Sequence, residues 1–77
     1  MPFLSHAELQ VIRAKAASLV TVGAKYRHAK GGLYTVLNVA LQESTQEPCV
    51  VYRSDDHPEL SWVRSVDNFL ERFTLVS

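Results

Sequence analysis

Residues 33–41 read LYTVLNVAL, and this stretch decides the class of fold. Side chains of an extended strand point alternately to its two faces, so a half-buried strand shows a period of two. The two predicted faces carry Leu33, Thr35, Leu37, Val39 and Leu41 on one side and Tyr34, Val36, Asn38 and Ala40 on the other. This alternation predicts the main β-strand of the protein.

Shorter strands are predicted on both sides of this stretch. They cover residues 25–28, 49–54, 60–65 and 74–76. The glycines of Lys30-Gly31-Gly32 supply the backbone freedom for a tight turn before the main strand. The polar segments 42–48 and 55–59 each contain a proline and connect the strands that follow. The pattern therefore predicts four or five short strands joined by tight turns.

Helices are predicted at both ends of the strand region. Ser5 and Glu8 fit a capping box, in which each side chain accepts a hydrogen bond from the backbone amide of the other residue. The helix that begins there is predicted over residues 5–21, with one buried stripe. The stripe consists of Leu9, Ile12, Ala16, Leu19 and Val20. Near the C-terminus, Ser65 is predicted to cap a short second helix. One face of that helix carries Val66, Phe69, Leu70 and Phe73.

These elements define an α+β protein that is mostly β. Closure of a small sheet into a barrel removes its exposed edges. We therefore expect an N-terminal helix packed on a small SH3-like antiparallel β-barrel or strongly curled sheet, with a short C-terminal helical turn. A half-open sheet covered by the helix is the alternative. The 77 residues are expected to form a single domain, with the helix at 5–21 and the β unit at 24–77.

Composition argues against several classes of protein. The formal net charge is zero, so the chain lacks the excess of basic residues that attracts nucleic acid over long distances. Cys49 is the single cysteine, which rules out an intramolecular disulfide, and small secreted domains usually carry several. No apolar run approaches the ~20 residues that span a bilayer, and residues 1–10 lack the apolar region of a signal peptide. We therefore expect a soluble, cytoplasmic protein with no membrane partner.

Several short motifs occur in a distinctive order. They are Tyr26-Arg27-His28-Ala29-Lys30-Gly31-Gly32-Leu33-Tyr34-Thr35-Val36-Leu37, then Val50-Val51-Tyr52-Arg53, then Trp62-Val63-Arg64, and finally Phe69. Over about residues 26–73 the chain resembles the bacterial family called domain of unknown function 1653. It departs from the family's pattern at Ala29, where a larger residue is usual, and at Ser65, which replaces a proline. The resemblance implies a small, mostly β, bacterial cytosolic domain and implies no activity.

Cationic side chains are concentrated beside the glycine turn. The segment contains Lys25, Arg27, His28 and Lys30, and the turn amides can also face an anion. Strand geometry places Tyr26 and His28 on one face and Lys25 and Arg27 on the other. The segment is a candidate site for an anion or a phosphate. In the alternative interpretation, Tyr26 and His28 are packed and hydrogen-bonded, and the lysines are solvated.

Trp62 and Arg64 share one face of the predicted strand 60–65, with Val63 on the other. If Val63 is buried, Trp62 and Arg64 are displayed together, where they can stack on a base, a peptide proline or another aromatic group. In the alternative interpretation, Trp62 fills the core and Arg64 pairs with an acid such as Asp67. The sequence leaves both interpretations open.

Tyrosines elsewhere in the chain extend this candidate surface. SH3-like barrels commonly bind partners through an aromatic strip, which Tyr34 or Tyr52 would join here. The full set of candidate binding residues is Tyr26, Arg27, His28, Lys30, Tyr34, Tyr52, Arg53, Trp62 and Arg64. We therefore expect a non-enzymatic binding module for a peptide or protein partner.

Two other functional classes are kept as alternatives. One is a nucleic-acid-binding module that uses an aromatic and basic patch. The other is a small enzyme or metabolite-binding protein with a site near His28. A homo-oligomer is also a reasonable expectation, because a second copy would extend the thin core of a small domain and could cover Val11 or a strand edge.

No catalytic residue, metal site or cofactor is predicted. Asp55-Asp56-His57 contains three possible ligands, but consecutive side chains rarely converge on one ion. Cys49 precedes a Val-Val-Tyr strand, where free cysteines are mostly buried and inert. The sequence lacks nucleophile-elbow and phosphate-loop motifs. Whether the chain is an enzyme stays open, and a non-enzymatic role is favoured.

Overall fold

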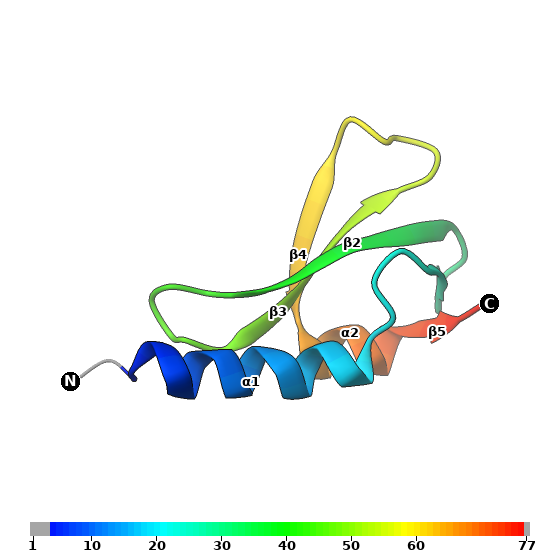
Figure 1. Cartoon of the computed structure of the whole chain (residues 1–77). Coiled ribbons are helices and arrows are strands. Elements are labelled where there is room, and N and C mark those ends of the chain that lie inside the picture. The colour runs from blue at the N-terminus through cyan, green and yellow to red at the C-terminus, as the bar shows by residue number, and fades with distance from the viewer. Residues whose placement is uncertain (1–3, 77) are drawn as a thin grey trace.

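The computed structural model describes residues 4–76 and has an α+β fold that is mostly β. Its elements are α1 His6–Leu19, β1 Lys25–His28, β2 Leu33–Leu41, β3 Pro48–Ser54, β4 Ser61–Ser65, α2 Val66–Arg72 and β5 Phe73–Leu75 (Figure 1). Each predicted helix and strand is present, and its ends lie within two residues of the prediction. Within the described chain, neither helix is long and apolar enough to cross a membrane.

The five strands form one antiparallel sheet in the order β4-β3-β2-β1-β5. In Figure 1, β2 runs roughly along α1, whereas β4 stands at a steep angle to the helix, so the sheet is strongly twisted. Across residues 4–76, β4 and β5 are the two edges and do not pair with each other. The sheet is therefore not closed, and the predicted SH3-like barrel is not confirmed.

The helix α2 explains how the sheet stays open. It joins the two edge strands and packs against β3, β4 and β5. A helix rather than a strand pair therefore completes this side of the core. The helix α1 packs against β2 and β3, in agreement with the alternative of a half-open sheet covered by the N-terminal helix.

A β-bulge interrupts the predicted alternation of β2. The register with β3 shifts between Val36 and Asn38, so Leu37 is the extra residue. As a result Val36 and Val39 are both buried, while Leu37 is exposed. The prediction that Leu37 shares a face with Val39 is therefore wrong, because one inserted residue moves every later side chain to the other face.

The start of α1 confirms the predicted capping box. Ser5 Oγ accepts a hydrogen bond from the Glu8 amide at 3.2 Å, and Glu8 Oε1 accepts one from the Ser5 amide at 3.0 Å. Further along, Ala16 and Val20 are buried in the core. Leu19 is 59% exposed, so its place in the predicted stripe is wrong. The helix ends at Leu19, and Val20 already has the extended backbone that turns its side chain inward.

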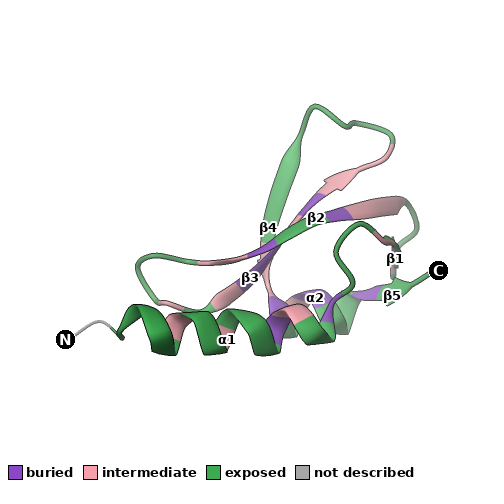
Figure 2. Cartoon of the chain, viewed as in Figure 1, coloured by how far each residue is buried: buried purple, intermediate pink, exposed green. Residues whose placement is uncertain are grey.

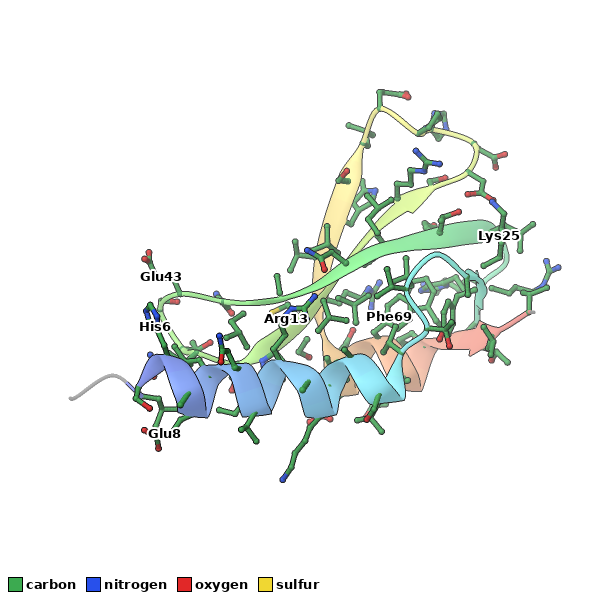
Figure 3. All side chains as sticks on the ribbon, in the orientation of Figure 1. His6, Glu8, Arg13, Lys25, Glu43 and Phe69 are labelled. Carbon is green, nitrogen blue, oxygen red and sulfur yellow. The ribbon has the colours of Figure 1, made fainter. Side chains whose placement is uncertain are left out.

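Arg13 attaches α1 to the bulge in β2. Its Nε donates to the Val39 carbonyl oxygen at 2.8 Å, and its Nη2 donates to Asn38 Oδ1 at 3.0 Å. Figure 3 shows Arg13 reaching from α1 toward β2. A bulge disrupts the local ladder of backbone hydrogen bonds, so an outside donor is well placed there. These two bonds hold α1 at the bulge, where the side chains of β2 switch from one face of the sheet to the other.

The cap of α2 is also as predicted, since Ser65 Oγ accepts a hydrogen bond from the Asn68 amide at 3.2 Å. Phe69 is fully buried, but Leu70 is 41% exposed. The predicted inward position of Leu70 is therefore wrong. With only seven residues, α2 contacts the core along a stripe narrower than the one expected.

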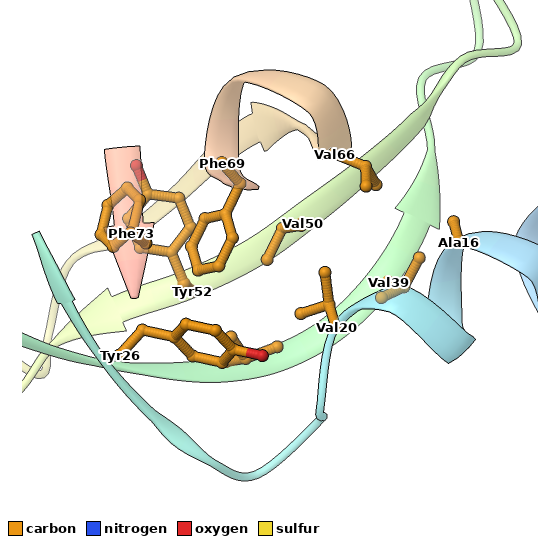
Figure 4. Close-up of a cluster of buried hydrophobic side chains, with 10 residues drawn as sticks. Ala16, Val20, Tyr26, Val39, Val50, Tyr52, Val66, Phe69 and Phe73 are labelled. Atoms are coloured by element: carbon orange, nitrogen blue, oxygen red, sulfur yellow. The ribbon is translucent and has the colours of Figure 1, made fainter. Parts of the chain in front are cut away.

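Phe69 lies at the centre of the hydrophobic core (Figure 4). Its ring stacks on Phe73, with centroids 4.2 Å apart and planes 7° from parallel. Tyr26 and Tyr52 pack against it at centroid distances of 5.1 and 5.3 Å. Buried residues are concentrated between the helices and the sheet, and the outward side of α1 is exposed (Figure 2). The aromatic cluster supports the inner face of the sheet, where the candidate site lies.

Candidate binding groove

A concave groove of about 320 Å³ lies on the inner face of the sheet. Its lining residues come from all five strands and are His28 of β1, Tyr34 of β2, Tyr52 and Ser54 of β3, Trp62 and Arg64 of β4, and Phe73 of β5. His57 and Leu60 from the β3–β4 connection complete it. Because both edge strands contribute, the concave groove lies where the curled sheet has not closed.

The pairing of β3 with β4 places Trp62 and Arg64 in the groove. Trp62 lies opposite Tyr52, and Arg64 lies two residues further along on the same face. Trp62 is 50% exposed, so the interpretation of this residue as a core block is wrong. Val63 points to the outer face and is 62% exposed, so it is not a core residue either. Trp62 and Arg64 are displayed together, although the sheet rather than a buried Val63 orients them.

Neutral partners hold Arg64 in position. Its Nε donates to Tyr52 Oη at 2.8 Å, and its Nη1 donates to Asn68 Oδ1 at 2.6 Å. Its guanidinium carbon lies 5.3 Å from the centroid of the Phe73 ring, in a cation–π contact. The expected pair with Asp67 is replaced by the bond to Asn68. No carboxylate within residues 4–76 forms an ion pair with Arg64, so the groove carries an unneutralised positive charge.

His28 lies on the opposite side of the groove from β4. Its ring packs edge-on against Phe73 at a centroid distance of 4.8 Å, and its Nδ1 accepts a hydrogen bond from the Lys30 amide at 3.0 Å. Desolvation lowers the pKa of His28 below its ordinary value of 6.5, and the nearby charges of Arg64, Lys30 and Arg72 lower it further. The ring is therefore neutral at pH 7, and because Nδ1 is an acceptor its proton lies on Nε2.

The structure brings five predicted binding residues into the groove, namely His28, Tyr34, Tyr52, Trp62 and Arg64. Four others lie elsewhere. Tyr26 is buried in the core, where its Oη accepts a hydrogen bond from the Thr21 amide at 3.0 Å. Arg27 is exposed on the other side of β1, and Lys30 is in the glycine turn. Arg53 belongs to the outer face of β3, where its Nε is buried without a described partner.

The glycine turn itself forms as predicted. Gly31 and Gly32 both have positive φ angles, of 100° and 88°. Most other residues are strained in this region of backbone space. A Cβ atom on Gly32 would lie in ordinary van der Waals contact, at 3.4 Å, with the Tyr34 ring, which is one wall of the groove. The turn therefore supports the groove through its shape, and it directs the Lys30 amide at His28.

The acidic connection after β3 does not assemble a metal site. Asp55 accepts hydrogen bonds from Lys25 and Thr35, whereas His57 Nδ1 lies 3.8 Å from Glu59 Oε1. Among residues 4–76, no group of three or more His, Cys, Asp or Glu side chains is arranged to hold a metal ion. Asp55 instead belongs to a polar cluster on the outer face of the sheet.

Sequence reasoning missed Ser54, Leu60 and Phe73 as groove residues, and it considered His57 only as a metal ligand. The signal for two of them was present as a period of two. Ser54 follows Tyr52 on the same face of β3, and Leu60 precedes Trp62 by two residues. Phe73 carried no such signal, because its position depends on where α2 ends and β5 begins.

A comparison with protein families identifies the family to which residues 24–75 belong. A family model described as "Protein of unknown function (DUF1653)" matches residues 24–75. The chain belongs to the DUF1653 family. No match was found among curated proteins or among solved structures. The DUF1653 match runs from just before β1 to the end of β5 and includes every residue that lines the groove, while α1 lies outside it.

Proposed function

We propose that this DUF1653 domain is a non-enzymatic binding module that holds a segment of a peptide or protein partner in the concave groove. One observation carries the proposal. Five side chains that the sequence pattern predicts as binding residues converge from four strands on one groove, although they lie far apart in the sequence. They are His28, Tyr34, Tyr52, Trp62 and Arg64. If each of these residues only stabilised its own strand, we would expect them to be scattered over the surface of the domain.

The composition of the groove supports a macromolecular partner. Trp62 is half-exposed, Tyr34 and Tyr52 form an edge-to-face pair at 5.6 Å, and Arg64 lies beside them. Tryptophan, tyrosine and arginine are the residue types most enriched at the energetic centres of protein interfaces. A half-exposed tryptophan also has apolar surface still to bury, which favours association.

The serine hydroxyl group in the groove is not arranged for nucleophilic catalysis. Ser54 Oγ accepts a hydrogen bond from the Asp56 amide at 3.2 Å. Within the described part of the chain, no hydrogen bond joins this hydroxyl to His28 or His57. A nucleophilic serine needs a base within hydrogen-bond reach, so this geometry favours binding over acyl transfer.

A selection experiment tests the proposal. A phage-displayed library of random dodecapeptides is panned against the immobilised full chain, and synthetic winners are titrated while amide NMR spectra are recorded. We expect shifts that saturate and cluster on residues 26–34 and 52–64. Trp62→Ala combined with Arg64→Ala is expected to abolish binding and to leave the far-UV circular dichroism spectrum unchanged. Trp62 is 50% exposed and Arg64 is half-buried, and both line the groove rather than belong to the buried core.

The opposite face of the same two strands provides a matched control. Arg53→Ala combined with Val63→Ala removes two side chains from β3 and β4 without touching the groove, and it should leave peptide affinity unchanged. If no peptide produces saturable shifts at the groove, or if both double variants bind equally well, the binding-module proposal is overturned. Tighter binding of a single-stranded RNA, with steep weakening by salt, would point instead to a nucleic-acid function.

A further inference from the structure

Three hydrogen-bond donors in the concave groove have no partner among the described residues. Arg64 Nη2, the Trp62 indole N–H and His28 Nε2 make no hydrogen bond to any residue in the described range 4–76. Arg64 Nη2 is also not a fully buried atom. None of the residues that line the groove is Asp or Glu. The groove is therefore complementary to an acceptor with negative charge.

Two of these donors belong to side chains that share Phe73 as a neighbour and face the groove from opposite sides. The Arg64 guanidinium and the His28 ring both pack against Phe73, at 5.3 and 4.8 Å from its centroid. An anion placed between them can accept from a charged guanidinium and from a neutral imidazole N–H. Charge-assisted hydrogen bonds of this kind are shorter and stronger than neutral ones.

The edge strand β4 forms one rim of the groove and favours an extended peptide as the carrier of that anion. Among residues 4–76, β4 pairs with β3 on one side only, so its outer backbone groups are unpaired. A peptide strand added to such an edge gains main-chain hydrogen bonds, and alternate side chains enter the adjacent pockets. Trp62 and Arg64 are two residues apart, so the peptide side chains that meet them are also two apart.

We propose that the groove binds an acidic peptide strand along β4, with one Asp or Glu carboxylate held by Arg64 and His28. An apolar or aromatic side chain two residues away packs on Trp62. This inference rests on the proposed function and specifies the chemistry of the partner. The zero net charge of the chain is consistent with a short-range, local recognition of charge rather than long-range attraction.

The selected peptides provide the first test. We expect the enriched sequences to share an acidic residue two positions from an apolar one. Trp62 is the single tryptophan of the chain, so its fluorescence reports directly on the groove. Replacing the key Glu by Gln in a synthetic winner should weaken binding roughly 10-fold to 100-fold, which is the usual worth of a hydrogen bond to a charged group. N-methylation of the peptide amides that face β4 should weaken it further.

Variants of the domain complete the test. In Arg64→Gln the preference for the Glu peptide over the Gln peptide should disappear, and in His28→Gln it should shrink. Arg53→Gln removes a cation from the opposite face and should keep the full preference, so it controls for net charge. If Arg64→Gln does not fold, as judged by its amide spectrum, Arg64→Lys keeps the charge without the planar fork and should reduce the preference.

The possible outcomes separate the inference from the proposed function. Groove-binding peptides that lack acidic residues, or equal affinity for the Glu and Gln peptides, overturn the inference and leave the binding module intact. Failure of every peptide to bind at the groove overturns both. An equal loss of preference in Arg53→Gln shows that general electrostatics, and not Arg64, selects the acidic peptide.

Discussion

One polar cluster on the outer face of the sheet and the groove on the inner face treat their charged groups in opposite ways. On the outer face, Lys25 Nζ donates to Asp55 Oδ2 at 2.7 Å and to Thr35 Oγ1 at 3.0 Å, and Thr35 Oγ1 donates to Asp55 Oδ1 at 2.7 Å. On the inner face, Arg64 has only neutral partners. The outer cluster neutralises itself, whereas the groove keeps a positive charge and unpaired donors. Such an unsatisfied site is where binding of an external group adds most.

The pKa values of the two clusters reflect this difference. The hydrogen bonds from Lys25 and Thr35 hold the pKa of Asp55 below its ordinary value of 3.8. An internal partner thus stabilises the charged form of Asp55. In the groove, by contrast, desolvation and neighbouring cations oppose the charged form of His28. The outer cluster pairs its charges, whereas the groove disfavours a second positive charge beside Arg64.

The largest expected effect is on the free energy of unfolding, and it compares the packing of the inner face with that of the outer face. Phe69→Ala should lower the free energy of unfolding by about 3–5 kcal/mol, because it leaves a cavity among the aromatic rings that support the groove. Val63→Ala on the outer face should change it by less than about 0.5 kcal/mol. Urea denaturation followed by circular dichroism measures both values. Equal costs for the two variants would contradict the division between a supported inner face and an open outer face.

A smaller effect tests whether the outer cluster is independent of the groove. Asp55→Asn removes the carboxylate that pairs with Lys25, and it should cost no more than about 1 kcal/mol because the pair is partly exposed. Peptide affinity at the groove should not change. A loss of peptide binding in this variant, measured by Trp62 fluorescence, would show that the outer cluster shapes the groove and that the two faces are coupled.

The smallest effect is on the pH dependence of the free energy of unfolding, in two separate pH ranges. The pKa of His28 is lowered on folding, so between that value and 6.5 the unfolded chain binds more protons, and stability falls as pH falls through this range. The pKa of Asp55 is also lowered, and its contribution is lost only as pH falls below about 3.8. Stability curves measured against pH for His28→Gln and Asp55→Asn should each lose one of these two steps. A variant that loses the other step would reverse the assignment.

Much of the candidate site could be predicted, and the reasons for success and failure are physical. Trp62 and Arg64 were expected to share a face because a strand alternates, and residues this close in sequence leave little freedom. Tyr26 and His28 were also expected to share a face, yet one is in the core and the other is in the groove. The period of two assigns a face but does not show which part of that face a neighbouring element covers.

The sequence alone determined the elements and their ends. The capping interactions of Ser5 and Ser65, the glycine turn and the alternating strands depend on residues within a few positions of one another, so local chemistry is sufficient. The tertiary structure alone decided the bulge at Leu37 and the open sheet with its groove. These features depend on which distant side chains meet, such as Arg13 with Asn38 and Arg64 with Tyr52. Such contacts follow from the packing of the whole chain, because no local pattern specifies their partners.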